Sequence, residues 1–377
     1  MLSLGKMNSP VVCIECSPLL VRSAGVKTYL YHWLNAMRTI SPGTLRTFLA
    51  PSGEETLQHE GGLRHHPGRL AVLQALNRLP AFFCDAVVPH CDLFHVSNLL
   101  RTLPRRRLSA TVHDLTAWIV PECHVDAIVS ADRKLAQNVF RQAAGIIAVS
   151  ENTKADAVRL LGLNPAKIQV IYPGVPESYF GVSTEAAEHA RMHYGLNRPF
   201  FLSVGTIEPR KNIDTLLAAW TALPAGFRME HELVIAGMPG WRSSETMRRI
   251  EQSAREHRGV RYLGYVPERD MPGLTSAAVA LVYPSLYEGF GLPVAQAMAA
   301  GCPVITSNIS SLPEITAGAA LLIDPRDEAQ LSAAIIRLAG SEALREQLRT
   351  DGIANSRLFT WERAASESLR FFSRIAG

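Results

Sequence analysis

Two adjacent cations stand where they could hold an anionic ligand. Arg210 and Lys211 follow the apolar run 200–204, on a loop that opens a helix pattern at 213–223. Cations at a helix start are electrostatically unfavourable, because the free N–H groups there already carry partial positive charge. A bound diphosphate accounts for this pair better than a solvated helix start, since a guanidinium and an ammonium group together can clamp phosphate oxygens.

Glu288 lies in a second segment of this kind, residues 284–293 (PSLYEGFGLP). The segment follows the apolar run 279–283 and leads into a helix pattern with Pro293 in its first turn, where a missing N–H group costs nothing. Its two glycines let the backbone approach a ligand, and the free N–H groups of the helix start favour an anion or a sugar hydroxyl. By itself the segment fits a plain strand–turn–helix connection with a capping acid at least as well.

Two further strand ends carry glycine-rich turns, residues 236–241 (AGMPGW) and 264–267 (GYVP). The first is a tight turn that contains Gly237. The second contains Val266 and could present its backbone to a nucleotide base. Four strand ends in a row therefore carry glycine-rich or charged loops, and the set is far more specific than any one member.

These loops need a fold that brings strand ends together. Short β-branched runs alternate with longer helix patterns along the whole chain, which is typical of βαβ units and parallel sheets. We therefore predict an α/β fold of two doubly wound, Rossmann-like domains that face each other across a cleft. The expected strands are 11–15, 47–50, 93–96, 110–113, 145–149 and 168–172 in the first half, and 200–204, 233–236, 260–263, 279–283, 304–306 and 320–323 in the second. The expected helices include 213–223, 243–257, 328–338 and 360–375.

A proline-rich break at residues 172–176 (YPGVP) interrupts both periods, so we expect the hinge between the domains there. The length of 377 residues also fits about two domains of roughly 150–200 residues each. The predicted units are 1–175, 176–358 and a C-terminal helix, 359–377, that packs back on the first unit.

Composition excludes several classes of protein. A hydrophobic fraction of 47% with 19% charged residues is that of a globular protein. No run of about 18 apolar residues and no signal peptide is visible, so we expect the protein to stay in the cytoplasm. Six irregularly spaced cysteines do not form a disulfide framework. Cys13 and Cys16 could be a redox or zinc pair, but buried thiols are the better interpretation because no second C-x-x-C occurs and no histidine pair follows them at the spacing of a zinc site.

The first half of the chain is basic. Residues 1–180 hold 18 Lys and Arg against 13 Asp and Glu, whereas residues 181–377 hold 20 against 21. Four arginines of the first half cluster: Arg101, Arg105, Arg106 and Arg107. Such a surface could face anionic lipid, a phosphorylated acceptor or nucleic acid, or could be a solvated loop. Nucleic acid is the weakest option because no recognisable binding module accompanies the cluster.

Three motifs resemble the family 4 (group 1) retaining glycosyltransferases of the GT-B fold: 205–212 (GTIEPRKN), 287–293 (YEGFGLP) and 310–314 (SSLPE). In the first half, residues 23–26 (SAGV) resemble the glycine loop of the family and residues 112–114 (VHD) its active-site histidine segment. The resemblance covers nearly the whole chain. It implies an acceptor-binding first domain and a second domain that binds a nucleotide-sugar donor.

The resemblance also implies a role for each matching residue. Arg210 and Lys211 would neutralise the donor diphosphate as it departs, and Glu288 would contact the transferred sugar. His113 would lie beside that sugar, although without the resemblance a structural role for this histidine is the better interpretation. Gly25 would let the first domain close over the phosphates. The remaining substrate-binding residues implied are Gly205, Gly237, Val266, Gly289, Phe290, Gly291, Leu292 and Gln296.

Gln296 is a departure from the family pattern. The family has a second glutamate eight positions after the first, and that residue usually binds the ribose hydroxyls of the nucleotide. A glutamine amide still accepts and donates, but it lacks the charge that strengthens such bonds. We expect nucleotide binding to be weaker by about 1 kcal/mol.

The resemblance implies retaining transfer of a hexose from a nucleotide sugar to a glycan or lipid-linked saccharide, as in envelope polysaccharide and lipopolysaccharide synthesis. Similarity to bacterial mannosyl- and rhamnosyltransferases favours mannose from GDP-mannose, while UDP-glucose and UDP-N-acetylglucosamine stay open. No Asp-x-Asp pair occurs, so we expect no metal and no other cofactor. Because the first half has a surplus of basic residues, we also expect the protein to associate peripherally with the inner face of an anionic membrane.

Two rival interpretations stay open. A non-catalytic subunit that binds nucleotide sugar or glycan is favoured only by Gln296, and a GT-B nucleotide-sugar epimerase would act on the donor without an acceptor. A nicotinamide-dependent dehydrogenase is disfavoured because no G-x-G-x-x-G follows the first strand. The acceptor has no assignment, since its contacts would come from loops 51–67 and 101–108, which carry no transferable motif.

Overall fold

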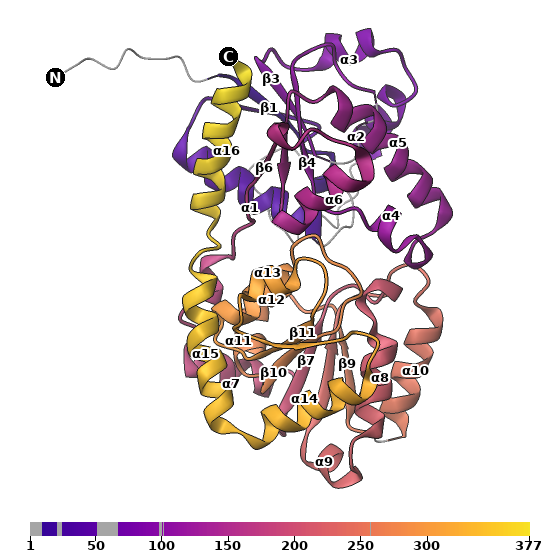
Figure 1. The fold of residues 1–377 in the computed structure, drawn as a ribbon, viewed down its shortest axis with the longest axis vertical. Coiled ribbons are helices and arrows are strands. Elements are labelled where there is room, and N and C mark those ends of the chain that lie inside the picture. Colours follow the sequence, from indigo (N-terminus) through magenta and orange to yellow (C-terminus); the bar gives the residue numbers. More distant parts are fainter. Residues whose placement is uncertain (1–9, 21–24, 51–66, 98–99, 101, 257) are drawn as a thin grey trace, which may run out of the picture.

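The computed structural model describes residues 10–20, 25–50, 67–97, 100, 102–256 and 258–377. Within them, twelve strands form two six-stranded parallel sheets, one in each half of the chain (Figure 1). The first sheet contains β1 (Val12–Glu15), β2 (Leu45–Phe48), β3 (Leu93–Val96), β4 (Leu108–Val112), β5 (Gly145–Ala148) and β6 (Ile168–Val170). The second contains β7 (Phe200–Val204), β8 (Glu232–Ala236), β9 (Val260–Gly264), β10 (Ala280–Tyr283), β11 (Val304–Ser307) and β12 (Leu321–Ile323).

All twelve predicted strands are present, with ends that differ from the prediction by at most two residues. The strands were recognisable because those in the middle of each sheet are buried on both faces, as in β1, β4 and β10. Parallel sheets covered by helices on both sides appear in a sequence as nearly continuous apolar runs.

Helices cover the faces of both sheets (Figure 1). They are α1 (Gly25–Ile40), α2 (Pro67–Leu76), α3 (Ala81–Val87), α4 (Thr116–Ile119), α5 (Asp126–Gln142), α6 (Glu151–Leu161), α7 (Thr184–His193), α8 (Ile213–Ala222), α9 (Ala225–Glu230), α10 (Ser244–Arg255), α11 (Met271–Ser276), α12 (Leu292–Ala299), α13 (Leu312–Thr316), α14 (Glu328–Gly340), α15 (Glu342–Ser356) and α16 (Trp361–Ala376). Several begin at a side-chain cap, and the Ser150 hydroxyl accepts from the Thr153 N–H group at 3.0 Å to start α6. No helix in the described part of the chain is long and apolar enough to cross a membrane.

The strand order identifies where a ligand would bind. It is β2-β1-β3-β4-β5-β6 in the first sheet and β12-β11-β10-β7-β8-β9 in the second. The direction of winding reverses between β1 and β3 and between β7 and β10. Open α/β sheets bind ligands outside the carboxyl ends of their strands at such reversals. The two loops that carry Lys211 and Glu288 follow β7 and β10, on either side of the second reversal.

The chain crosses between the halves twice, near residues 175 and 359, and the two crossings are paired. The Val175 N–H group donates to the Phe359 carbonyl at 2.9 Å. A Cβ atom on Gly174 would lie 2.2 Å from the Trp361 nitrogen, so only glycine fits there. We keep 175 and 358 as proposed domain boundaries on this basis.

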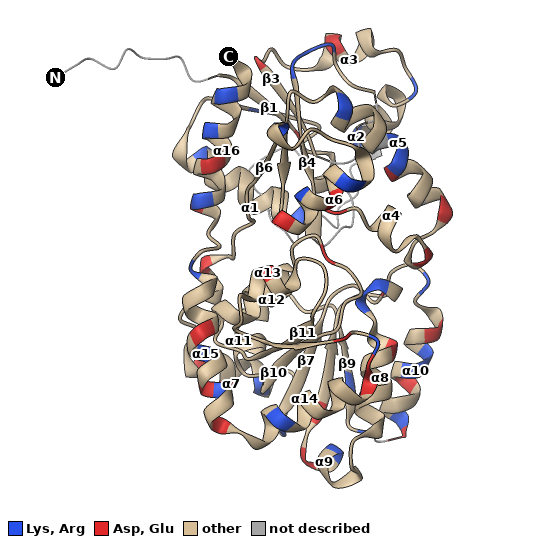
Figure 2. Ribbon diagram, viewed as in Figure 1, with Lys and Arg blue, Asp and Glu red and all other residues tan. Residues whose placement is uncertain are grey.

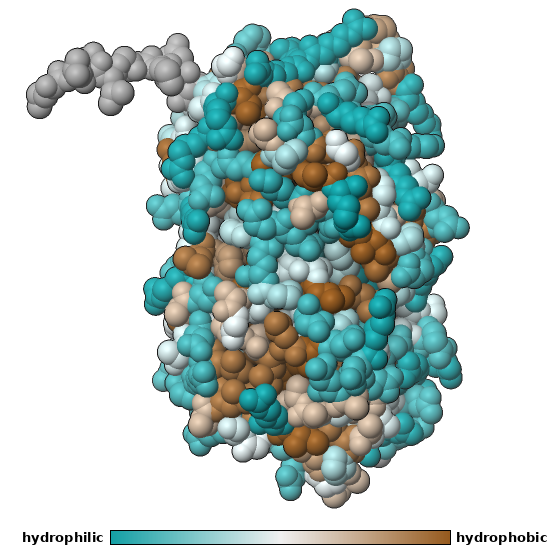
Figure 3. Space-filling view, in the orientation of Figure 1, coloured by the Kyte–Doolittle hydropathy of each residue, from teal (hydrophilic) through white to brown (hydrophobic). Residues whose placement is uncertain are grey.

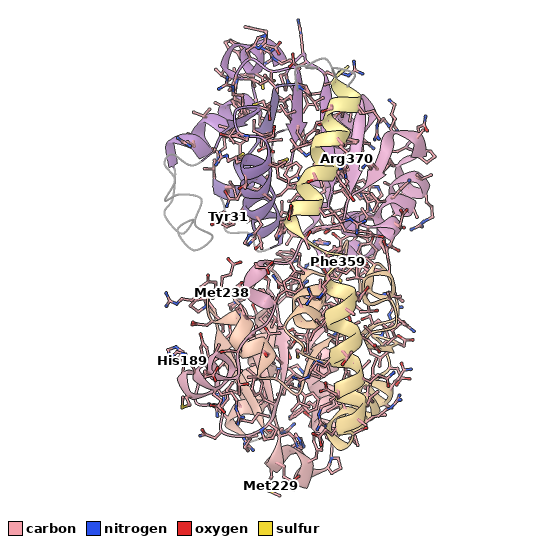
Figure 4. The ribbon with its side chains drawn as sticks, turned by 90° about the vertical axis from the view of Figure 1, so that its left-hand side faces the viewer. Tyr31, His189, Met229, Met238, Phe359 and Arg370 are labelled. Carbon is pink, nitrogen blue, oxygen red and sulfur yellow. The ribbon has the colours of Figure 1, made fainter. Side chains whose placement is uncertain are left out.

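After the second crossing, α16 returns to the first half and packs along α1 (Figure 1), where the Trp33 indole N–H donates to the Ser368 hydroxyl at 2.9 Å. One hydrophobic cluster runs through both halves and includes Trp33, Phe359 and Phe290. Phe359 lies between the yellow helices α15 and α16 where the halves meet (Figure 4), and its ring centroid is 5.4 Å from that of Phe290. All six cysteines, Cys13 and Cys16 included, are free and buried.

Candidate active site

Glycine makes close contact possible at the carboxyl ends of β7 and β8. Gly205 and Gly237 both have positive φ angles, of 144° and 151°. A Cβ atom on Gly237 would lie 1.8 Å from the Gly205 carbonyl oxygen. The two loops therefore touch through backbone alone, which leaves the Lys211 side chain against Gly205.

Arg210 and Lys211 extend from the short 3-10 helix Pro209–Lys211, and their side chains are only 12% exposed. The solvated helix start is therefore the wrong interpretation of this pair. Both cations meet Glu288: the Lys211 ammonium lies 2.6 Å and the Arg210 guanidinium 2.8 Å from its Oε1 atom. Arg210 also pairs with the buried carboxylate of Glu208 at 2.5 Å.

Two hydroxyl groups complete the surroundings of Glu288. Ser285 donates to Oε1 at 2.6 Å, and Tyr283 donates to the same atom at 2.9 Å. All four polar contacts of this carboxylate with described residues fall on Oε1. The other oxygen, Oε2, makes no hydrogen bond within the described part of the chain, so it can accept from a ligand hydroxyl.

The electrostatics of this cluster keep Glu288 ionised. Burial alone would raise its pKa, but the charges of Arg210 and Lys211 outweigh burial and lower the pKa to about 2. Burial and the neighbouring Arg210 lower the pKa of Lys211. The pKa of Glu208 is raised, chiefly by its burial. Arg210 and Lys211 thus both face Glu288, which is firmly ionised. A diphosphate could take the place of this carboxylate as the anionic partner of the two cations.

The loop that carries Glu288 is positioned by its backbone. Gly291 has φ 100° and stands at the N-cap of α12, and a Cβ atom there would lie 2.8 Å from the Leu312 side chain. The Glu288 N–H group donates to the Ser310 hydroxyl at 3.2 Å. Phe290 is buried, and Leu292 begins α12. Loop 287–291 is therefore held over the reversal point of the second sheet by contacts with Ser310 and Leu312.

His113 and the loop of Glu288 meet across the two halves. A Cβ atom on Gly289 would lie 1.7 Å from the His113 carbonyl oxygen and 3.0 Å from the Asp114 Cβ. The imidazole packs edge-on against Tyr29, with ring centroids 4.9 Å apart. Burial lowers the pKa of His113 to about 4, against the opposing effect of Asp114, so the ring is neutral at pH 7.

The structure thus brings most of the predicted site residues together. Arg210, Lys211, Glu288, Gly205 and Gly237 form one cluster on the second half. His113 and Gly289 join it to the first half, and Phe290, Gly291 and Leu292 continue the same loop. Three predicted residues lie further along the same edges: Gly25 begins α1, Val266 is buried after β9, and Gln296 lies partly buried on α12.

Sequence reasoning missed three members of the cluster: Glu208, Tyr283 and Ser285. Each lies within five residues of a predicted one and near the carboxyl end of β7 or β10. A polar residue at the end of an apolar run is the signal that could have identified them.

Comparison with known proteins decides the family. A family model described as glycosyl transferases group 1 matches residues 187–354, and one described as glycosyltransferase family 4 matches residues 24–179. The O-antigen chain mannosyltransferase B of Escherichia coli is 34% identical over 286 residues, which make up 75% of this chain and 74% of that protein. The chain belongs to the family 4 (group 1) glycosyltransferases.

Solved structures agree on the fold of this glycosyltransferase. Sucrose-phosphate synthase from Thermosynechococcus elongatus superposes with a TM-score of 0.73 at 22% identity, covering 96% of this chain and 98% of that one. The Anabaena protein HepE in complex with UDP-glucose has a TM-score of 0.71 at 17% identity, covering 96% and 99%. The predicted GT-B fold and the predicted enzyme class are therefore confirmed, whereas the role of each site residue stays a prediction.

Proposed function

We propose that this glycosyltransferase transfers a hexose, specifically mannose from GDP-mannose, to a glycan or lipid-linked saccharide with retention of configuration, in envelope polysaccharide synthesis. The convergence of Arg210, Lys211 and Glu288 on one buried point, with His113 opposite, is the observation that carries the proposal. The likeness to the Escherichia coli O-antigen mannosyltransferase supports mannose as the transferred sugar.

In the proposed reaction, the bond between C1 of the hexose and the diphosphate oxygen breaks, and its electron pair leaves with the diphosphate. Arg210 and Lys211 neutralise that charge from preorganised positions, which is the main source of rate acceleration in such a site. The acceptor hydroxyl forms the new bond on the face that the diphosphate leaves. Its proton passes to a departing phosphate oxygen. Because the new bond forms on the same face as the bond that breaks, the configuration at C1 is retained.

Glu288 and His113 would act on the sugar rather than on the phosphates. With a pKa of about 2, the Glu288 carboxylate is ionised at neutral pH and can stabilise positive charge that develops at C1. Its Oε2 atom would accept from a sugar hydroxyl while Oε1 stays with the hydroxyl groups of Tyr283 and Ser285. The neutral imidazole of His113 would hydrogen bond to the sugar from the first half.

Turnover with a panel of nucleotide sugars tests the proposal. GDP-mannose, UDP-glucose and UDP-N-acetylglucosamine are each supplied with a lipid-linked saccharide acceptor, with and without a chelator, and nucleotide release is measured. We expect release of GDP from GDP-mannose alone, at a rate that the chelator leaves unchanged. Turnover of a UDP-sugar would show that the donor is not GDP-mannose. If no nucleotide is released from any of the three donors, the proposed reaction is wrong.

The surface around α3 supports a peripheral position on an anionic membrane at the cytoplasmic face. Phe82 and Phe83 are 53% and 41% exposed, with ring centroids 4.1 Å apart, and Val87 on the same helix is 52% exposed. The Arg105 N–H group donates to the Asp85 carboxylate at 2.6 Å, which holds the arginine loop beside α3. Blue segments flank α3 in Figure 2, and brown atoms lie over it in Figure 3.

Arg105 and Arg107 are exposed, whereas the fourth arginine of the cluster, Arg101, lies outside the described residues. Exposed apolar rings beside arginines are what an anionic lipid surface binds. Vesicles that contain phosphatidylglycerol should bind the parent protein, and bind the variant with both Arg105→Ser and Arg107→Ser at least several-fold more weakly. Equal binding by the two proteins would remove the membrane from the proposal.

A further inference from the structure

Glu314, the last residue of the 310–314 motif, makes contacts that the proposed reaction does not use. It lies on α13 in the second half, yet its carboxylate accepts three hydrogen bonds from the first half. The N–H groups of Glu151 and Asn152 donate at 2.7 and 3.0 Å, one to each oxygen. The Tyr172 hydroxyl donates at 2.7 Å. The carboxylate thus closes the N-terminus of α6 from across the molecule.

This contact is favourable for a definite physical reason. The first N–H groups of a helix have no partner within the helix and carry partial positive charge. A carboxylate that accepts from two of them forms charge-assisted bonds, which are stronger than neutral ones. The bond from Tyr172, beside the first crossing between the halves, fixes the carboxylate from a third side.

The other end of the same motif holds the loop of Glu288. The Ser310 hydroxyl accepts from the Glu288 N–H group at 3.2 Å. The Ser311 hydroxyl lies 2.9 Å from the Phe290 carbonyl oxygen and 3.0 Å from that of Glu288, and it can donate to either. The five consecutive residues 310–314 therefore connect the loop of Glu288 at one end to the first half at the other.

The N-terminus of α6 also touches that loop directly. Ser150 donates to the Gly289 carbonyl at 2.6 Å, and Thr153 donates to the same oxygen at 3.0 Å. The start of α6 thus receives a carbonyl group from the sugar-facing loop and a carboxylate from α13. By contrast, Arg210 and Lys211 lie wholly on the second half, and their side chains bond to Glu208, Tyr283, Tyr287 and Glu288 rather than to α6.

We propose that Glu314 is a positioning residue, which couples closure of the two halves to placement of the Glu288 loop. When its carboxylate docks on α6, the motif brings Glu288 and Gly289 to their position opposite His113 in the same step. The inference rests on the proposed function for its kinetic part only. Nucleotide binding depends on the second half and should persist when the contact between Glu314 and α6 is lost. Turnover, by contrast, should fall.

Two conservative substitutions separate the contributions. Glu314→Gln keeps the shape of the side chain, but an amide NH₂ group would face one of the α6 N–H donors, so at least one bond is lost. Tyr172→Phe removes a single bond and keeps the ring that packs 5.6 Å from Phe359. Glu328→Gln is the matched control, because Glu328 is an exposed carboxylate in the first turn of α14.

For Glu314→Gln we expect kcat to fall roughly 10- to 100-fold, the effect of losing hydrogen bonds to a charged group, with the Kd for GDP changed less than about threefold. Tyr172→Phe should show the same pattern with a smaller fall in kcat, and Glu328→Gln should match the parent. A kcat within twofold of the parent for Glu314→Gln, or a loss of GDP affinity as large as the loss of kcat, would overturn the proposal.

A second readout needs no turnover. Dyes on Met229→Cys and Arg370→Cys report the separation of the halves, since these exposed positions lie on α9 and α16 and the native cysteines are buried (Figure 4). Glu314→Gln should shift the dye distances to larger values, and an unchanged distribution would contradict the coupling. If no nucleotide sugar is turned over by the parent, the proposed reaction fails while this measurement still decides the role of Glu314.

Discussion

The two sheets are built alike, yet their carboxyl edges present different chemistry. On the second half, Arg210, Lys211 and Glu288 form a buried cluster in which every charge has a partner of the opposite sign. On the first half, the groups that meet the Glu288 loop are the His113 carbonyl, the hydroxyl groups of Ser150 and Thr153, and the Asp156 carboxylate, which accepts from the Tyr287 hydroxyl at 2.6 Å. The two cations of the cluster thus lie on one side of the contact, and carbonyl, hydroxyl and carboxylate groups lie on the other.

This difference shows how the two halves divide the reaction. The second half is equipped to hold a diphosphate and the charge that develops on it, whichever acceptor is present. The first half brings the groups that close the site and, by the proposed function, the acceptor. Loss of a charge on the second half should therefore change kcat/KM. Loss of the close contact between the halves should lower kcat and leave GDP binding intact.

Removal of Lys211, one of the two cations expected to hold the diphosphate, should have the largest effect on turnover. Lys211→Ala leaves the departing diphosphate with one cation, so we expect kcat/KM to fall by roughly 10²- to 10³-fold, as for other preorganised electrostatic groups. Lys167→Ala, at an exposed lysine of the first half, is the control and should not change the rate. A fall of less than about tenfold for Lys211→Ala would show that the second half does not carry the charge.

A disturbed fit between the halves should come next. In Gly289→Ala the new methyl group would overlap the His113 carbonyl, 1.7 Å from the ideal Cβ position, so the halves cannot reach the observed contact. We expect kcat to fall roughly 100-fold, the cost of misplacing reacting groups by about 1 Å, while GDP still binds. Gly340→Ala, which has no neighbour within 4 Å, is the matched control. Full activity in Gly289→Ala would mean that the contact is not needed for turnover.

The neutral state of His113 should be visible as a pH dependence of stability. Its pKa is about 4 in the folded protein against 6.5 for an ordinary histidine, so the unfolded chain binds more protons between these values. The free energy of unfolding should therefore decrease as the pH falls from 6.5 to 4. In His113→Gln this decrease should be smaller by roughly 2 kcal/mol, measured by urea unfolding at a series of pH values. Parallel pH profiles for the two proteins would contradict a neutral imidazole in the folded protein.

The smallest expected effect is at Gln296. Gln296→Glu would restore the charge that the family pattern has at this position, and we expect GDP to bind about three- to tenfold more tightly. Isothermal titration of both proteins with GDP measures the change. Unchanged or weaker binding would mean that Gln296 does not meet the ribose.

The fold could be predicted from the sequence to a large extent, because buried parallel strands leave apolar β-branched runs such as 200–204 and 279–283. The core of the site followed from charged or glycine-rich residues directly after those runs, since parallel strands end at one edge. Strand ends were less accurate: β4 ends at Val112, so His113 lies just beyond it rather than within it.

Long-range pairings could not be predicted in the same way. The hydrogen bonds between Glu314 and the start of α6 join residues more than 160 positions apart, and nothing in the sequence near either segment indicates the other. The partners of Glu288 at Tyr283 and Ser285 are close in sequence, but their role depends on how the β10 loop folds back. The acceptor loop predicted at 51–67 falls almost wholly outside the described residues, so its part in the site stays a prediction.

Above all, we propose that the second half holds the diphosphate of the donor through Arg210 and Lys211. A crystal structure of the protein with GDP-mannose or GDP tests it most directly. We expect phosphate oxygens within hydrogen-bond distance of the Arg210 guanidinium and the Lys211 ammonium, with Glu288 turned toward the sugar. A nucleotide whose phosphates contact the first half instead, with both cations still paired to Glu288, would contradict it.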